Sequence, residues 1–248
     1  ELVGSSSPKA DSEIILMAAK ALSNLGIENL SIDLCLPTLV PTICKSHKIE
    51  STTIINRLRD ALDEKDKPSI EKLEKELGEE TNCIFSSLLE AVGPVDKALK
   101  LLKQINLPKT AADELNKLSN VISCLKTQTP NLPITIDPVE TRGYKYHTGV
   151  TFTFFALNVR GEIGRGGRYL VKDANGTKAP EPAIGASLYI DSVLRALPKP
   201  IKKKRVLVSS LEPLIAQNLR EEGWIAIESF DANKLNSDSQ AKEAGCTH

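Results

Sequence analysis

The spacing of apolar residues changes along the chain, and each change predicts a different kind of structure. Between residues 5 and 26, apolar side chains recur every three or four positions, which predicts a helix that ends at Gly26. Asp11 or Ser12 is the expected N-cap, because their oxygens can accept the first free backbone N–H groups. Over residues 30–36 apolar and polar residues alternate, which predicts a strand with one buried face.

Residues 37–128 show no alternation and instead repeat apolar residues at helical spacing among lysines and glutamates. We expect several amphipathic helices here, interrupted at Gly93-Pro94 and at Leu107-Pro108. Apolar helix faces usually pack into a core. The segment is therefore interpreted as a structural helical insertion with no ligand site of its own.

Strand patterns return at residue 133 and continue to about residue 190, and they include the β-branched and aromatic run 150–155. No long helix separates these strands, so a largely antiparallel sheet is expected and the fold class is α+β. After a basic link, residues 203–248 show a short βαβ pattern and are expected to form a partial small α/β domain. The expected domains are therefore 1–198 and 203–248.

Composition narrows the classes of protein that fit. The 248 residues carry 32 Lys+Arg against 32 Asp+Glu, and this balance argues against nucleic acid as the main partner. The five cysteines are scattered and never spaced C-x-x-C, which argues against a disulfide framework or a zinc site and favours a cytoplasmic location. No apolar run approaches about 20 residues, so no membrane span and no membrane partner are expected.

The residues best suited to chemistry cluster in two neighbouring segments, 140–149 and 161–169. Arg142 offers a guanidinium fork for a carboxylate or phosphate, and Tyr146 and His147 combine flat rings with polar tips. The glycines of 161–169 let the backbone approach a ligand. Two interpretations stay open from the residues alone: a small-molecule pocket, or tight turns beside a surface ion pair.

Three motifs resemble the class II histidyl-tRNA synthetases: Thr141–Gly149, Gly164–Tyr169 and Pro182–Asp191. The variants Tyr-His-Thr-Gly and Gly-Arg-Gly-Gly-Arg-Tyr are most similar to synthetase paralogues that serve as the regulatory subunit of ATP phosphoribosyltransferase. The resemblance covers the whole chain in order and implies the class II synthetase fold, an antiparallel sheet with helices. It also implies that motif 1 and most of motif 2 lie upstream, since the opening Glu1-Leu-Val-Gly resembles the stretch just after motif 2.

The resemblance implies roles for individual residues. Glu1 matches the acidic residue that holds the α-amino group of histidine, and Arg142 matches the catalytic arginine of the synthetases. Tyr169 matches a tyrosine of the histidine side-chain pocket. The expected histidine-like pocket consists of Glu1, Arg142, Tyr146, His147, Arg168 and Tyr169.

Three positions depart from the synthetase pattern. Lys145 stands where synthetases usually have Asp, and His147 replaces a second pocket tyrosine. Ser192 stands where motif 3 supplies the arginine that binds the ATP triphosphate. A hydroxyl cannot supply that fixed positive fork. We therefore expect a decayed adenylation site with no catalytic residue, no cofactor and no metal.

These features together imply a non-catalytic regulatory subunit. It would bind and activate a short-form ATP phosphoribosyltransferase catalytic subunit, in the first step of histidine biosynthesis, and take part in feedback inhibition by L-histidine. A homodimer within a hetero-oligomer is expected. Histidine could bind in the remnant pocket or at a subunit interface. Two alternatives stay open: a fragment of a true histidyl-tRNA synthetase, and a nucleic-acid or scaffold module built on the helical insertion.

Overall fold

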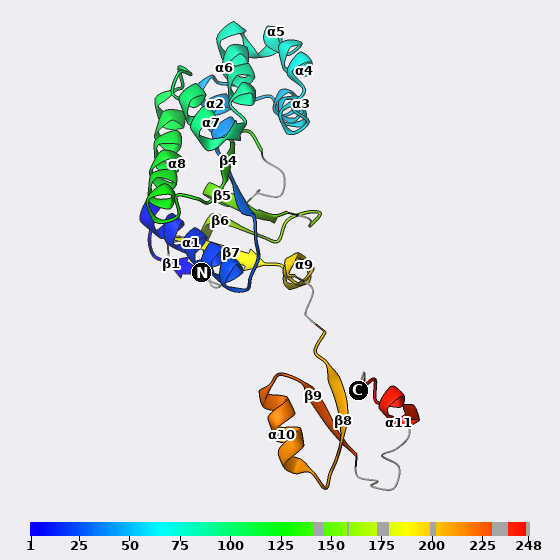
Figure 1. Ribbon diagram of the computed structural model, residues 1–248. Coiled ribbons are helices and arrows are strands. Elements are labelled where there is room, and N and C mark those ends of the chain that lie inside the picture. The colour runs from blue at the N-terminus through cyan, green and yellow to red at the C-terminus, as the bar shows by residue number, and fades with distance from the viewer. Residues whose placement is uncertain (141–145, 158, 173–178, 199–201, 230–237, 247–248) are drawn as a thin grey trace. The chain divides into compact units, whose positions relative to one another are not determined.

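The computed structural model describes residues 1–140, 146–157, 159–172, 179–198, 202–229 and 238–246. The chain divides into two compact units, residues 1–198 and residues 199–248, and each is described by itself. The first unit contains a seven-stranded sheet (Figure 1) in the order β1-β7-β6-β5-β2-β4-β3. Its strands are β1 (Leu2–Val3), β2 (Leu30–Cys35), β3 (Gly93–Pro94), β4 (Ile134–Asp137), β5 (His147–Ala156), β6 (Gly164–Val171) and β7 (Glu181–Leu188).

All neighbouring strands of this sheet run antiparallel except β2 and β4, which are parallel. The predicted α+β class and the largely antiparallel sheet are thus confirmed. A parallel pair needs a long crossover connection, and here the predicted helical segment supplies it. The crossover contains α2 (Leu39–Ser46), α3 (Thr52–Asp63), α4 (Lys67–Glu71), α5 (Glu74–Leu77), α6 (Glu79–Glu90), α7 (Val95–Leu102) and α8 (Lys109–Gln128).

The helical segment differs from the prediction in one detail. Gly93-Pro94 was expected only to interrupt the helices, but these two residues form β3, which pairs with β4 at the edge of the sheet. Proline donates no backbone N–H, so it is tolerated at an edge where no further strand needs that donor.

Helix α1 (Pro8–Asn24) lies where a helix was predicted, but its N-cap is Ser7 rather than Asp11 or Ser12. The Ser7 hydroxyl accepts a hydrogen bond from the backbone N–H of Lys9 at 3.2 Å, and Pro8 occupies the first helical position. Proline fits there because that position needs no intrahelical donor. Asp11 and Ser12 are instead buried inside the first turns of the helix.

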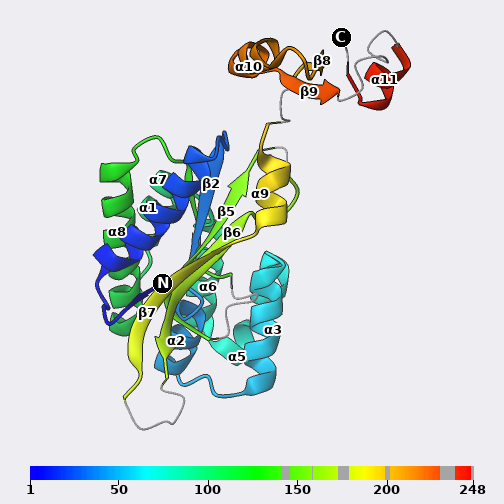
Figure 2. The same ribbon diagram turned by 90° about the horizontal axis from the view of Figure 1, so that it is seen from below.

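The two faces of the sheet differ in composition. Phe152 and Phe154 of β5 are fully buried in the main hydrophobic core, while Thr151 and Thr153 point to the opposite face. Helix α1 packs along the sheet with α8 beside it (Figures 1 and 2), and side chains from α1 and α8 complete this core. The opposite face carries the polar side chains and the candidate site.

An ion pair connects the helical crossover to the sheet just before the first candidate segment. The Lys65 Nζ atom, just after the C-cap of α3, lies 2.6 Å from Asp137 Oδ2 at the end of β4. The other oxygen of Asp137 accepts hydrogen bonds from the backbone N–H groups of Val139 and Glu140. This carboxylate therefore fixes the path of the chain as it leaves β4.

Helix α9 (Ile190–Ala196) follows β7 directly and completes the first unit. The second unit contains β8 (Arg205–Ser209), α10 (Pro213–Glu221), β9 (Ile225–Ser229) and α11 (Asp238–Glu243). β8 and β9 are parallel and α10 connects them, as predicted for a βαβ unit. The buried core of this unit is small and consists of Val208, Ala216 and Ala226. Among the described helices of both units, none is long and apolar enough to cross a membrane.

Candidate functional site

A cavity of about 310 Å³ lies on the polar face of the sheet, over β6 and β7. Four of the residues expected in a ligand pocket line it: Glu1, Tyr146, His147 and Tyr169. The sequence did not identify Arg165, Ser187 and Tyr189, which also line it, together with the backbone of Gly166, Gly167 and Gly185. The cavity is thus built from one face of β6 and β7, the start of the chain and the beginning of β5.

Glycines form the floor of this cavity. Gly167 and Gly185 are directly paired between β6 and β7. A Cβ atom at position 185 would lie about 2.1 Å from Glu1 Oε2, so only glycine leaves room for that carboxylate. A Cβ atom at position 167 would lie 2.6 Å from the His147 ring. The glycine-rich segment therefore forms strands that functional side chains approach closely, and not a loop.

The Glu1 carboxylate is held by Tyr169. The Tyr169 hydroxyl donates a hydrogen bond of 2.7 Å to Glu1 Oε2. This bond, with burial and the negative charge of Glu1, raises the pKa of Tyr169 to about 12. Tyr169 thus stays protonated near neutral pH and acts as a hydrogen-bond donor to the Glu1 carboxylate.

Aromatic rings form one wall of the cavity. The ring centroids of Tyr146 and His147 lie 4.0 Å apart, and Tyr146 meets Tyr169 edge-on at 6.1 Å. Tyr146 is 66% exposed, so its ring borders the opening. This wall suits a flat, partly polar group such as an aromatic heterocycle.

Arg165 lies at the other end of the cavity from Glu1. It pairs in register with Ser187, one same-face step along the strands from the Gly167–Gly185 pair. Arg165 Nη1 lies 3.6 Å from Glu162 Oε1, and both side chains are partly exposed. Burial raises the pKa of the neighbouring Tyr189, with a further contribution from the charge of Glu162. The cavity therefore has an anionic end at Glu1 and a cationic end at Arg165.

Arg168 was expected in this pocket, but the structure places it on the opposite face of β6. Its Nε and Nη2 atoms donate to Asp11 Oδ1 at 2.9 and 2.5 Å, and Nη1 donates to the backbone oxygen of Ser5 at 2.7 Å. The reason is the strand alternation: Tyr169 faces the cavity, so its neighbour Arg168 must face α1. This guanidinium fixes the segment between Glu1 and α1.

The first turn of α9 contains Ser192, the position that matches the ATP-binding arginine of the synthetases. Ser192 is buried, and its hydroxyl accepts a hydrogen bond of 2.9 Å from Arg195 Nη2. Arg195 also lies 3.3 Å from Asp191 Oδ2. Arg142 and Lys145 lie outside the described residues.

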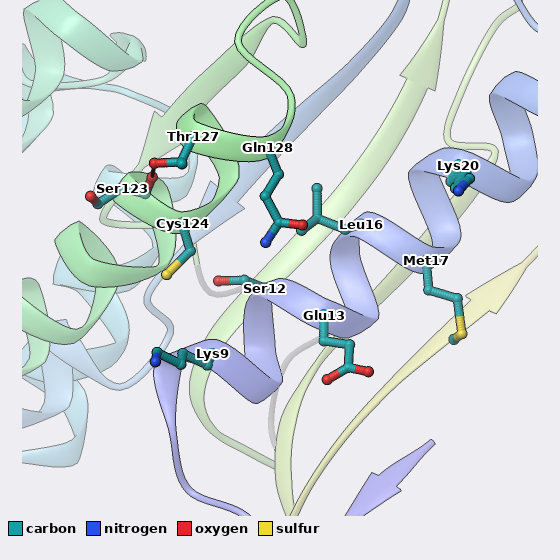
Figure 3. Close-up of a pocket in the computed structure, with 10 residues that line it drawn as sticks. All are labelled: Lys9, Ser12, Glu13, Leu16, Met17, Lys20, Ser123, Cys124, Thr127 and Gln128. Atoms are coloured by element: carbon teal, nitrogen blue, oxygen red, sulfur yellow. Dashed lines mark hydrogen bonds between the residues drawn. The ribbon is translucent and has the colours of Figure 1, made fainter.

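A larger groove of about 750 Å³ lies between α1 and α8 (Figure 3). The Ser12 hydroxyl lies in it but donates to the backbone oxygen of Pro8, and Thr127 donates to the oxygen of Ser123. Lys9 and Lys20 lie at opposite ends of the labelled residues in this view. These two hydroxyls serve the helices themselves. We regard the sheet cavity as the candidate site.

Other chemistry finds little support in the described part of the chain. No group of three or more His, Cys, Asp and Glu side chains there is placed to hold a metal ion. Burial, together with the charge of Asp33, raises the pKa of the Cys35 thiol well above its usual value, so this thiol does not act as a nucleophile near neutral pH.

The sheet, its cavity and the helical crossover define a fold of the class II aminoacyl-tRNA synthetase type. The chain belongs to the histidyl-tRNA synthetase family, whose model matches residues 1–193. Among solved structures, a protein of Bacillus halodurans described as an ATP phosphoribosyltransferase regulatory subunit/histidyl-tRNA synthetase matches with a TM-score of 0.74 and 20% identity, over 98% of this chain and 64% of that one. The histidyl-tRNA synthetase of Nostoc matches with a TM-score of 0.71 and 21% identity, over 98% and 62%.

Curated relatives are more similar in sequence. The ATP phosphoribosyltransferase regulatory subunit of Paramagnetospirillum magneticum is 41% identical over 249 aligned positions, and that of Rhodospirillum centenum is 37% identical. Both alignments cover all of this chain and 62% of the relative, so the chain spans less than two thirds of these proteins. The ATP phosphoribosyl transferase (HisG:HisZ) complex of Thermotoga maritima also matches in fold, with a TM-score of 0.59 and 16% identity, over 75% of this chain and 63% of that one.

Proposed function

We propose that this chain is part of a non-catalytic regulatory subunit that binds and activates the short-form catalytic subunit of ATP phosphoribosyltransferase. The names of the relatives at 37–41% identity support this assignment. The fold relative from Thermotoga maritima is part of a complex that is also named for ATP phosphoribosyl transferase. We further propose that the subunit is a homodimer within the hetero-oligomer.

The observation that carries the non-catalytic role is the contrast between the sheet cavity and the first turn of α9. The cavity keeps an acid, three tyrosines and a histidine that suit an amino acid, whereas the first turn of α9 carries Ser192. A serine whose hydroxyl accepts a bond from Arg195 supplies no fixed cation for a triphosphate at that position. The arrangement favours a protein that senses an amino acid over one that activates it.

Histidine is the ligand that we assign to the cavity. Its imidazole suits the aromatic wall, and its α-ammonium group suits Glu1. Regulation then requires that histidine bind one state of the assembly more tightly than another, because only that difference can shift activity.

A reconstitution assay tests this proposal. The full-length protein is mixed with a short-form catalytic subunit from the same source, and formation of phosphoribosyl-ATP is followed with and without histidine. We expect activity only in the mixture and suppression by histidine. The same protein carrying Glu1→Gln should still activate but respond to histidine less than the wild type, while Glu13→Gln, on the helix groove, should behave as wild type.

The competing function is that of a histidyl-tRNA synthetase, which the family model and the Nostoc structure favour at the level of fold. A mixture as inactive as its separate parts, together with attachment of histidine to its tRNA by the full-length protein, would overturn the regulatory assignment.

A further inference from the structure

Opposite charges lie at the two ends of the sheet cavity. The Glu1 carboxylate lies above Gly185, and Arg165 pairs with Ser187 two residues further along β7. Same-face positions on a strand are separated by about 6.6 Å, and the long side chain of Arg165 can cover part of that interval. A small ligand over the glycine floor can therefore contact both ends.

The Arg165 guanidinium is poorly satisfied by its protein partner. Its distance of 3.6 Å to Glu162 exceeds that of a good hydrogen bond, and the two side chains are 44% and 34% exposed. Exposed pairs of this kind contribute little stability. A ligand carboxylate that meets the planar fork directly can replace Glu162 at small cost.

The two ends of the cavity thus match the two charges of a free α-amino acid. Glu1 accepts a hydrogen bond from the Tyr169 hydroxyl at Oε2, and the same carboxylate can accept the ammonium group. Arg165 can donate two parallel hydrogen bonds to the carboxylate. The side chain of the amino acid then lies towards the wall formed by Tyr146, His147 and Tyr169.

We propose that Arg165 is the specificity-determining residue that recognises the ligand's free carboxylate, so that the cavity binds an amino acid as a zwitterion. This inference rests on the proposed function and adds to it a selectivity for ligands that carry a free carboxylate. Esters, amides and alcohols derived from the amino acid lack the anionic group and bind weakly. The subunit therefore responds to the free amino acid and not to its activated or reduced forms.

Calorimetric titration of the full-length protein tests this assignment with three probes: L-histidine, L-histidinol, which lacks the carboxylate, and imidazolepropionate, which lacks the amine. We expect wild type to bind histidine at least about tenfold more tightly than either analogue, as the loss of one charged hydrogen-bonding partner predicts. Arg165→Met should lower the affinity for histidine by a similar factor and leave the affinity for histidinol unchanged.

Two variants serve as controls. Glu1→Gln should weaken histidine and histidinol but not imidazolepropionate, which reverses the pattern of Arg165→Met. Arg57→Met removes an arginine from an exposed ion pair with Glu76 in the helical segment and should leave all three affinities unchanged.

The assignment of Arg165 is overturned if Arg165→Met changes the affinities for histidine and histidinol equally, or changes neither affinity. It is also overturned if the wild type binds none of the three probes. The proposed function is judged separately, by whether the wild-type protein activates the catalytic subunit in the reconstitution assay.

Discussion

The two faces of strand β6 show how one short segment serves stability and binding at the same time. On one face, Arg168 is buried and makes three hydrogen bonds to Asp11 and Ser5. On the other, Tyr169 makes one hydrogen bond, to Glu1, at the edge of an open cavity. The polar groups of the first face are satisfied within the protein, whereas those of the second leave capacity for a ligand.

The Arg168 face should contribute most to stability. We expect Arg168→Met to lower the free energy of unfolding by about 3 kcal/mol, because it leaves the Asp11 carboxylate buried without its partner. Chemical denaturation of the full-length protein measures this loss. The matched variant Arg57→Met, from an exposed pair, should cost less than about 1 kcal/mol. Equal losses for the two variants would show that the buried pair contributes no more to stability than the exposed pair.

The glycines of the same two strands separate the faces further. Gly166 points to the core, where a Cβ atom would lie 2.1 Å from the oxygen of Gly185 and 2.4 Å from the Phe152 ring. We expect Gly166→Ala to cost about 2 kcal/mol of unfolding free energy, since neither neighbour can move freely. For Gly185→Ala the three nearest atoms all belong to the flexible Glu1 carboxylate, so its cost should stay within about 0.5 kcal/mol.

For histidine binding the order of the two variants should be reversed, with the larger loss in Gly185→Ala. Gly185→Ala displaces the Glu1 carboxylate, so histidine affinity, measured by calorimetry, should fall by at least about tenfold. If Gly185→Ala binds histidine as wild type does, the cavity does not hold the ammonium group at Glu1.

Much of the fold followed from apolar periodicity, and the exceptions have identifiable causes. Alternation located β2, a β-branched and aromatic run located β5, and helical spacing located the crossover. Periodicity carries no information on strand direction, so the parallel β2–β4 pair was missed. The N-cap was missed although Pro8 marks the first helical position and thereby points to Ser7.

The site was less predictable because the glycine-rich segment 161–169 was left open between a ligand pocket and tight turns, without a strand assignment. In a loop, Arg168 and Tyr169 can share a pocket, whereas in a strand they must face opposite sides. The same alternation groups Arg165, Gly167 and Tyr169 on one face, and it would have identified Arg165. Ser187 and Tyr189 line the cavity because of the register in which β7 pairs with β6. That register depends on contacts between separate strands, which the apolar pattern of either strand does not show.

The smallest expected effect concerns the proton of Tyr169. Its pKa is raised to about 12 by the hydrogen bond to Glu1, by burial and by the negative charge of Glu1. Since the pKa in the folded protein exceeds the ordinary value of 10.0, this bond contributes its stability fully below pH 10. The contribution disappears as pH rises from 10 through about 12.

Ultraviolet absorbance of tyrosinate measures this titration, and Tyr169→Phe identifies the step that belongs to Tyr169 among the four tyrosines of the chain. In Glu1→Gln the neutral side chain no longer favours the protonated phenol, so the high step should move back towards 10. Gly185→Ala, which displaces the carboxylate without neutralising it, should produce a smaller shift in the same direction. A high step that stays in place in both variants would assign the raised pKa to burial rather than to Glu1, and the anionic end of the cavity would then lack its main support.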